Sequence, residues 1–164
     1  MSTTYGWGLD IPAEKISETV LEIFKMGFKE EIVEVVDGKV LRFQFVNGEM
    51  QTNEIDGEEK EKILAIWKEG YLGGMSYDDW ETLSPDSVSV FVPMEDNFFD
   101  SFGHGGPQDK HVESAGNAIH RLEEFMNDMR EDEIGEEDET MEFCREMVDL
   151  LRMAIENKFI FSVS

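Results

Sequence analysis

Hydrophobic residues recur with two different periods along the chain, and the change of period separates candidate helices from candidate strands. Apolar positions three or four residues apart predict a helix that begins near Pro12. Its apolar face carries Ile16, Val20, Ile23, Phe24 and Phe28. From residue 32 to residue 55 the period is two, interrupted by Asp37-Gly38 and Asn47-Gly48, and both dipeptides favour tight hairpin turns. The pattern predicts a three-stranded antiparallel meander with strands at 32–36, 40–46 and 50–55.

The segments around this meander carry weaker signals. Residues 1–10 have two glycines around Trp7 and are expected to form an irregular arm. Asp56 suits the start of a second helix that ends before Gly70. Residues 71–86 are expected to form a loop with a short helical turn at 77–80. Alternating valines then predict a strand at 88–92, which Pro93 ends, and a turn-rich loop is expected at 102–107.

The helical period returns in the last third of the chain. One helix is predicted from an apolar stripe of Ala115, Ile119, Leu122, Phe125, Met126 and Met129. A second is predicted from Met141, Cys144, Met147, Val148, Leu151 and Ile155. Gly135 separates them, which predicts a helical hairpin, and residues 159–163 are expected to return as a strand.

The predicted fold class is α+β. The three-stranded antiparallel meander is expected to be extended by one or two further strands, to pack with helices, and to carry an acidic helical hairpin at the C-terminal end. We expect a single domain over residues 1–164, with a sheet-rich part at 1–94 and an acidic helical part at 95–164.

Charge is the property that bears most directly on function. The formal net charge is −24, and both parts of the chain contribute. Residues 1–94 hold nineteen acidic and eight basic residues, a balance of −11, and residues 95–164 hold nineteen and six, a balance of −13. Direct binding to nucleic acid, to an anionic membrane or to a phosphate-rich substrate is therefore disfavoured.

The negative charge is densest in residues 123–142, where eleven carboxylates accompany one basic residue, Arg130, for a local charge of −10. These carboxylates belong to Glu123, Glu124, Asp128, Glu131, Asp132, Glu133, Glu136, Glu137, Asp138, Glu139 and Glu142. As one continuous helix the segment would span about 30 Å, or about one charge per 2.7 Å. That spacing lies between those of the phosphates on one strand and on both strands of DNA. The eleven residues are therefore predicted to contact a basic partner.

Other features restrict the compartment and the chemistry. Cys144, the only cysteine, lies in an apolar stripe, which predicts an inert buried thiol and no intrachain disulfide. The sequence has no apolar stretch of membrane-spanning length and no secretory signal pattern at its N-terminus, so we expect a cytoplasmic protein.

The three histidines raise the question of a metal site. His104 and His111 lie in or next to a glycine-rich loop, and Asp100, Asp109 and Glu113 are near them in sequence. The ligand set falls short of a structural zinc site, so His104 and His111 are only weak candidates for a catalytic metal site. There is no nucleophile elbow and no phosphate-binding glycine loop. No cofactor is expected.

Three functional hypotheses follow from these observations. The first is a non-enzymatic inhibitor whose carboxylates imitate DNA phosphates and occlude a basic nucleic-acid-binding protein, such as a nuclease. Phage anti-defence proteins and nuclease-immunity proteins would have this design. The second is a small metal-dependent hydrolase that uses His104, His111 and nearby carboxylates. The third is an acidic adaptor that contacts its partner through its sheet or its aromatic residues, such as Trp7.

Overall fold

The computed structural model describes residues 2–69, 73–83, 88–102 and 110–163. Five helices lie in these ranges: α1 (Ala13–Lys25), α2 (Gly57–Glu69), α3 (Tyr77–Leu83), α4 (Ala115–Glu131) and α5 (Glu139–Asn157). The strands are β1 (Ser2–Trp7), β2 (Ile32–Val36), β3 (Lys39–Val46), β4 (Glu49–Ile55), β5 (Gly73–Ser76), β6 (Val88–Val92), β7 (Phe99–Phe102), β8 (Lys110–Ser114) and β9 (Phe161–Val163). The class is α+β, as the sequence predicts.

The predicted meander is present as a sheet of its own, with strand order β2-β3-β4. Val40 lies opposite both Val35 and Ile55, so all three strands are antiparallel and in register. Both residues of each predicted turn have positive φ: 51° and 79° at Asp37-Gly38, and 53° and 80° at Asn47-Gly48. Two consecutive left-handed residues match the right-handed twist of a hairpin, which explains why the turns fall where the sequence places them.

The expectation that further strands extend this meander is wrong. The other six strands form a separate sheet in the order β5-β1-β9-β6-β8-β7, in which only β6 and β8 run parallel. An isolated parallel bridge joins Val33 of β2 to Phe159, two residues before β9. Because β9 pairs with β1 and β6 on its two sides, it has no free edge with which to join the meander.

Two segments predicted to be irregular are ordered elements of the six-stranded sheet and its surroundings. The expected N-terminal arm contains β1, which pairs with β5 and β9. The expected loop at 71–86 contains β5 in its described part, 73–83, and the short helical turn expected at 77–80 is present as the longer helix α3. Strands β1 and β5 pair with each other across more than sixty residues of sequence, so no local pattern predicts them. Most of the expected loop at 102–107 lies outside the described residues.

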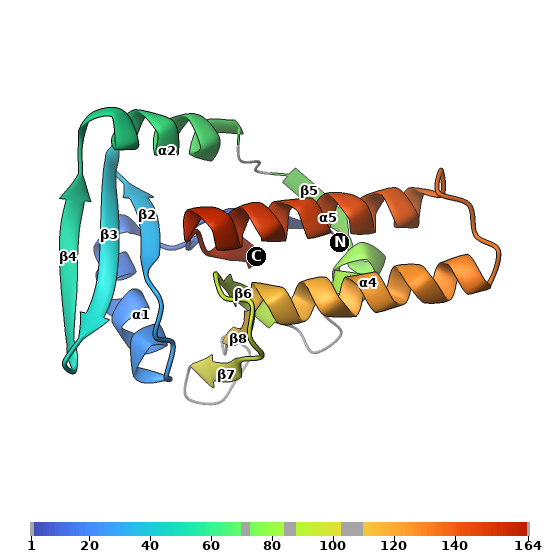
Figure 1. Ribbon diagram of the computed structural model, residues 1–164, viewed down its shortest axis with the longest axis horizontal. Coiled ribbons are helices and arrows are strands. Elements are labelled where there is room, and N and C mark those ends of the chain that lie inside the picture. Colours follow the sequence, from blue (N-terminus) through green and yellow to red (C-terminus); the bar gives the residue numbers. More distant parts are fainter. Residues whose placement is uncertain (1, 70–72, 84–87, 103–109, 164) are drawn as a thin grey trace.

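Two hydrophobic clusters support this arrangement. One joins α1 to the meander and to β6 and β8, and in it Phe24 stacks on Phe45 with ring centroids 5.5 Å apart. The other lies among α3, α4, α5 and the six-stranded sheet. Helices α4 and α5 lie side by side and point away from the meander (Figure 1). None of the described helices is both long and apolar enough to cross a membrane.

Candidate protein-interaction surface

Helix α4 places its carboxylates outward because its apolar residues follow one stripe. The hydroxyl of Ser114 caps the helix by accepting a hydrogen bond from the Asn117 backbone N–H at 3.1 Å. The buried stripe consists of Ala115, Ala118, Ile119, Leu122, Met126 and Met129. Phe125, which the sequence assigns to this stripe, is instead 37% exposed, because its position lies at the edge of the buried face.

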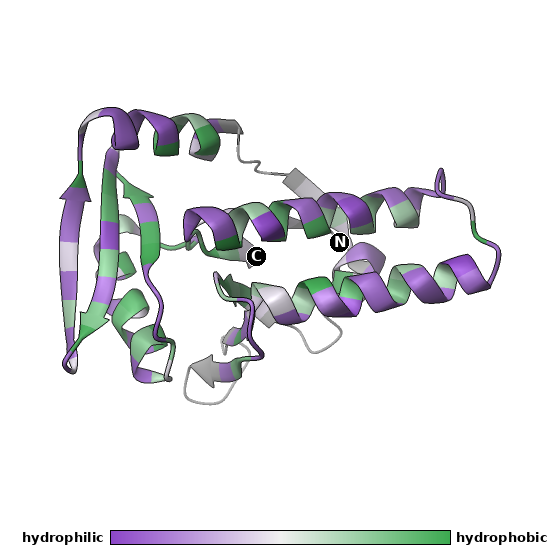
Figure 2. Ribbon diagram, in the orientation of Figure 1, coloured by the Kyte–Doolittle hydropathy of each residue, from purple (hydrophilic) through white to green (hydrophobic). Residues whose placement is uncertain are grey.

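Helix α5, the other helix of the pair, also has a capped N-terminus and one buried apolar stripe. Asp138 caps it by accepting a hydrogen bond from the Thr140 backbone N–H at 2.9 Å. Its buried side chains are Met141, Cys144, Met147, Val148, Leu151 and Ala154. Hydrophilic positions cover the outer sides of both helices and much of the connection between them (Figure 2). The buried phase of α5 therefore leaves Glu139 and Glu142 exposed in its first turn.

The predicted partner-binding carboxylates lie on α4, on the connection and on the first turn of α5. Ten of the eleven are exposed, and Glu123 is half-buried. Glu123 accepts a hydrogen bond from Arg152 at 3.1 Å, which links α4 to α5, and Glu124 contacts His120 at 3.1 Å within α4. These two lie on the part of the helix pair nearer the sheet, whereas the other nine lie toward its far end.

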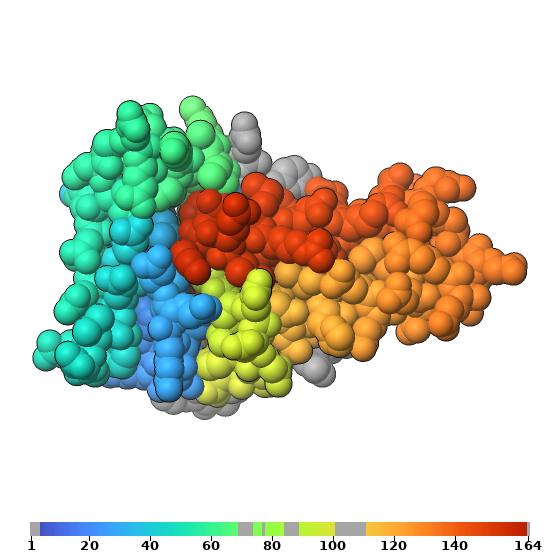
Figure 3. All heavy atoms as spheres, in the orientation of Figure 1, coloured from blue at the N-terminus to red at the C-terminus, as the bar shows by residue number. Residues whose placement is uncertain are grey.

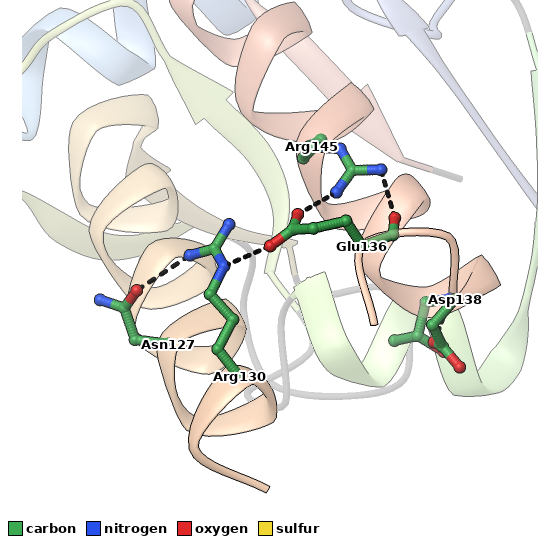
Figure 4. A network of polar contacts seen from close by, with 6 residues as sticks. Asn127, Arg130, Glu136, Asp138 and Arg145 are labelled. Carbon is green, nitrogen blue, oxygen red and sulfur yellow. Dashed lines mark hydrogen bonds and ion pairs between the residues drawn. The ribbon is translucent and has the colours of Figure 1, made fainter. Parts of the chain in front are cut away.

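Glu136 has a different role from its neighbours because two arginines hold it (Figure 4). Arg130 from α4 donates to one carboxylate oxygen at 2.7 Å, and Arg145 from α5 donates to the other at 2.5 Å. Arg145 also donates to the Glu136 carbonyl oxygen at 2.6 Å, and Arg130 donates to Asn127 Oδ1 at 3.0 Å. The hydrogen bond from Arg130 is the main cause that lowers the pKa of Glu136, and the same contact raises the pKa of Arg130.

Backbone contacts fix the rest of the connection. The backbone N–H groups of Asp132, Glu133 and Ile134 donate to the carbonyls of Asp128, Arg130 and Met129 at 3.1, 3.0 and 3.0 Å. Glu133 adopts a left-handed conformation, with φ of 62°, where the chain leaves α4. The half-buried Ile134 packs against the core cluster beneath the helices. The backbone of the connection is therefore held by these contacts, and the positions that carry its carboxylates are ordered.

Seven carboxylates remain without a side-chain hydrogen bond or ion pair to any residue that the structure describes. They belong to Asp128, Glu131, Asp132, Glu133, Glu137, Glu139 and Glu142, and we call this set the acidic surface. The other four carboxylates of the predicted set belong to Glu123, Glu124, Glu136 and Asp138, which have structural partners. The arginine contacts of Glu136 are not evident from the sequence, because Arg130 and Arg145 lie six and nine residues away, outside any short helical spacing.

The arginine network provides a direct test of how the connection is held. We expect Glu136→Gln to increase amide hydrogen exchange at residues 132–138, because the connection loses its charged contacts with both arginines. The increase should be about two- to fivefold, since each exposed ion pair contributes little to stability. Glu137→Gln removes the same charge one residue away without disturbing an arginine, so exchange should stay at the wild-type rate. Equal rates in the two variants would show that the network does not hold the connection.

The weak metal candidates are not gathered into a site within the described residues. His111 lies in β8 and stacks on Phe99 with ring centroids 6.0 Å apart, whereas His120 lies on the exposed side of α4. Glu113, a nearby carboxylate, is buried and receives hydrogen bonds from Arg121 at 2.5 and 2.8 Å. No group of three or more potential ligands occurs among the described residues, and His104 and Asp109 lie outside them.

Cys144 is buried in the core of the helix pair, as predicted. Burial, with a smaller contribution from the charge of Asp79, raises the pKa of the thiol to about 11. Since the thiolate is the reactive form, this environment suits a packing residue and not a nucleophile.

Comparisons of the chain with protein-family models, with curated proteins and with solved structures find no match.

Proposed function

We propose that the acidic helical hairpin formed by α4 and α5 binds a basic, nucleic-acid-binding protein and occludes the groove that normally receives nucleic acid. The partner class is a nuclease or another protein with a cationic groove, as in phage anti-defence or nuclease-immunity systems. The mechanism is steric and electrostatic, with carboxylates in the positions of phosphates. The single observation that carries the proposal is the set of seven exposed carboxylates at one end of the helix pair, none of which is paired with a side chain of the described residues.

The shape of the molecule supports this role. In the space-filling view the far end of α4 and α5 extends beyond the rest of the chain (Figure 3). A projecting end can enter a groove that a flat face could not. Because the chain folds back on itself, carboxylates at 128–133 and at 137–142 lie at the same end of the pair. The charge is therefore gathered in a smaller region than one continuous helix of the same sequence would occupy.

The rigidity of this end also supports binding. An ordered connection loses little conformational entropy when a partner binds, so the entropic cost of binding is smaller. A concentrated field of one sign also speeds diffusional encounter with a surface of the opposite sign. The arginine network and the packing of Ile134 provide the order, and the acidic surface provides the field.

The proposal predicts that reversing charge on the acidic surface slows association. The triple variant Asp128→Lys, Glu131→Lys and Glu137→Lys avoids the capping residue Asp138 and the arginine-bound Glu136. We expect its association rate with the purified partner to fall by about 10- to 100-fold at low salt. Wild-type affinity should fall steeply as salt rises, because exposed charges are screened beyond about 8 Å at physiological ionic strength.

A matched control separates this surface from the overall charge. The triple variant Glu49→Lys, Glu54→Lys and Glu61→Lys changes exposed residues of β4 and α2. In both triples three reversals add six charges and change the net charge from −24 to −18. The partner is isolated on immobilised wild-type protein, and binding is then measured with and without competing duplex DNA. Equal slowing by both triples, or no competition by DNA, would contradict occlusion through the acidic surface.

A further inference from the structure

The opposite end of the helix pair, nearer the sheets, contains a cleft with different chemistry. It has a volume of about 850 Å³ and lies between the start of α4, the end of α5 and the connection from β6 to β7. Its lining includes Glu95, Ile119, Glu123, Arg152, Ile155 and Glu156. A volume of this size falls in the range of sites that enclose a ligand or part of a peptide.

A glycine at the start of α4 allows this cleft to form. The Gly116 backbone N–H donates to the carbonyl oxygen of Met94 at 2.9 Å, which draws the β6–β7 connection against the helix. A Cβ at this position would lie 2.1 Å from the carbonyl oxygen of Glu95. No side chain fits that space without moving backbone. Gly116 therefore sets how closely Glu95 approaches the helix pair.

A second hollow of about 560 Å³ adjoins the cleft at Glu95 and Glu156. Glu95, Ile155 and Glu156 line both hollows, and the second one reaches Lys29 and Glu30 in the connection between α1 and β2. Two hollows that share a wall form an extended groove. An extended chain segment fits this shape better than a compact small molecule does.

Carboxylates outnumber basic side chains in the lining of the groove, which favours a cation. The carboxylates are those of Glu30, Glu95, Asp96, Glu123 and Glu156, and the lysine and arginine side chains are those of Lys29, Arg152 and Lys158. Arg152 is paired with Glu123, and His120 contacts Glu124, so neither side chain is available to an anionic ligand. The first amides of α4 are also occupied, because Gly116 donates to Met94 and Asn117 donates to Ser114. This occupancy removes the usual anion-binding capacity of a helix start.

The carboxylates of the shared wall have no such partners. Glu95 and Glu156 are exposed and make no side-chain ion pair with any described residue. The half-buried Ile155 lines both hollows together with them. The C-terminal end of α5 adds partial negative charge at the same place. An apolar surface between carboxylates suits a lysine or arginine side chain, whose stem is aliphatic and whose head is charged.

We propose that this groove binds an extended basic peptide segment of a partner protein. A lysine or arginine side chain of that segment lays its stem on Ile155 and places its charged head between Glu95 and Glu156. The site goes beyond the proposed function, since it uses none of the residues of the acidic surface.

Nuclear magnetic resonance with short peptides tests the proposal. The probe is a capped pentapeptide of sequence Gly-Leu-Arg-Leu-Gly, titrated into the ¹⁵N-labelled full chain. We expect shifts at the amides of Gly116, Ile119 and Ile155. The peptide with glutamine in place of arginine should bind about tenfold more weakly, and the peptide with glutamate should not bind measurably, because hydrogen-bonded charge pairs are lost or reversed.

Variants of the chain identify the carboxylates that matter. Glu95→Gln and Glu156→Gln should each weaken binding of the arginine peptide by about two- to fivefold. Glu49→Gln removes the same charge from β4 and should leave binding unchanged. Equal weakening by Glu49→Gln, equal binding of the glutamine peptide, or shifts confined to residues 128–142 would each overturn the proposal. Because this experiment does not use the partner of the acidic surface, its outcome is independent of the proposed function.

Discussion

Replacing Glu34 with glutamine is expected to stabilise the protein at neutral and alkaline pH and to change its stability little at acidic pH. Glu34 lies in β2 and is 1% exposed, and the Leu9 backbone N–H donates to its carboxylate at 3.2 Å. Burial raises the pKa of Glu34 from 4.5 to about 8, and the hydrogen bond from Leu9 opposes this shift only in part. The folded protein therefore holds a proton on Glu34 at pH values where the unfolded chain has released it.

The sign of the pH dependence follows from this proton. Below about pH 4.5 both states are protonated, and the neutral carboxyl group costs the folded state nothing extra. As the pH rises toward about 8 the folded state binds one more proton than the unfolded state, so the free energy of unfolding decreases. The slope is at most about 1.4 kcal/mol per pH unit, and the total loss is roughly 3–5 kcal/mol. Glutamine stays neutral and lacks this loss.

Denaturant unfolding of the wild type and Glu34→Gln from pH 4.5 to 9 measures the effect. The difference between the two proteins should grow with pH and level off above about pH 8. Glu113→Gln is the matched control, because Glu113 is 3% exposed but is paired with Arg121. That variant should lose stability, since it leaves Arg121 without its counter-charge. A constant difference between wild type and Glu34→Gln across the pH range would show that Glu34 is ionised in the folded state.

Truncation of Leu151 is expected to produce the second large effect. Leu151 lies on the inner side of α5 and is fully buried, as is Met147 one turn earlier. We expect Leu151→Ala to reduce the free energy of unfolding by about 2–5 kcal/mol, because the variant loses apolar burial and leaves a cavity. This is a large share of the stability of a small domain. Partner binding should weaken as a consequence, because α5 carries Glu139 and Glu142 of the acidic surface.

A second substitution on the same helix distinguishes residues that stabilise α5 from residues that contact the partner. Glu142→Gln changes an exposed residue in the first turn of α5, so its denaturant midpoint should stay close to that of the wild type. Its association rate with the partner should decrease slightly, because one surface charge is lost. A wild-type midpoint for Leu151→Ala would mean that α5 does not bury this side of its surface, and the outward position of Glu142 would then be wrong too.

The elements that the sequence predicted well are those specified by neighbouring residues. The meander follows from alternating apolar positions and from two turns whose residues accept positive φ. The phases of α4 and α5 follow from apolar residues at helical spacing, and Cys144 is buried as its place in that spacing predicts. Strands β1, β5, β7 and β8 were missed. Each strand is short, and its stability comes from pairing with another strand. That partner is distant in the sequence or lacks the alternation of apolar and polar residues that predicts a strand.

The sequence by itself determined how much negative charge this protein carries and where along the chain it is concentrated. Only the tertiary structure decided which of those charges are available. Glu136 is bound by Arg130 and Arg145, Glu123 by Arg152, and Glu34 is buried beneath the Leu9 backbone. The reason is physical: ionisation and pairing depend on the solvent and charges within a few ångströms, and folding brings those groups together from distant positions. The net charge follows from the composition, whereas the pairing of each acidic side chain with a basic one follows from the fold.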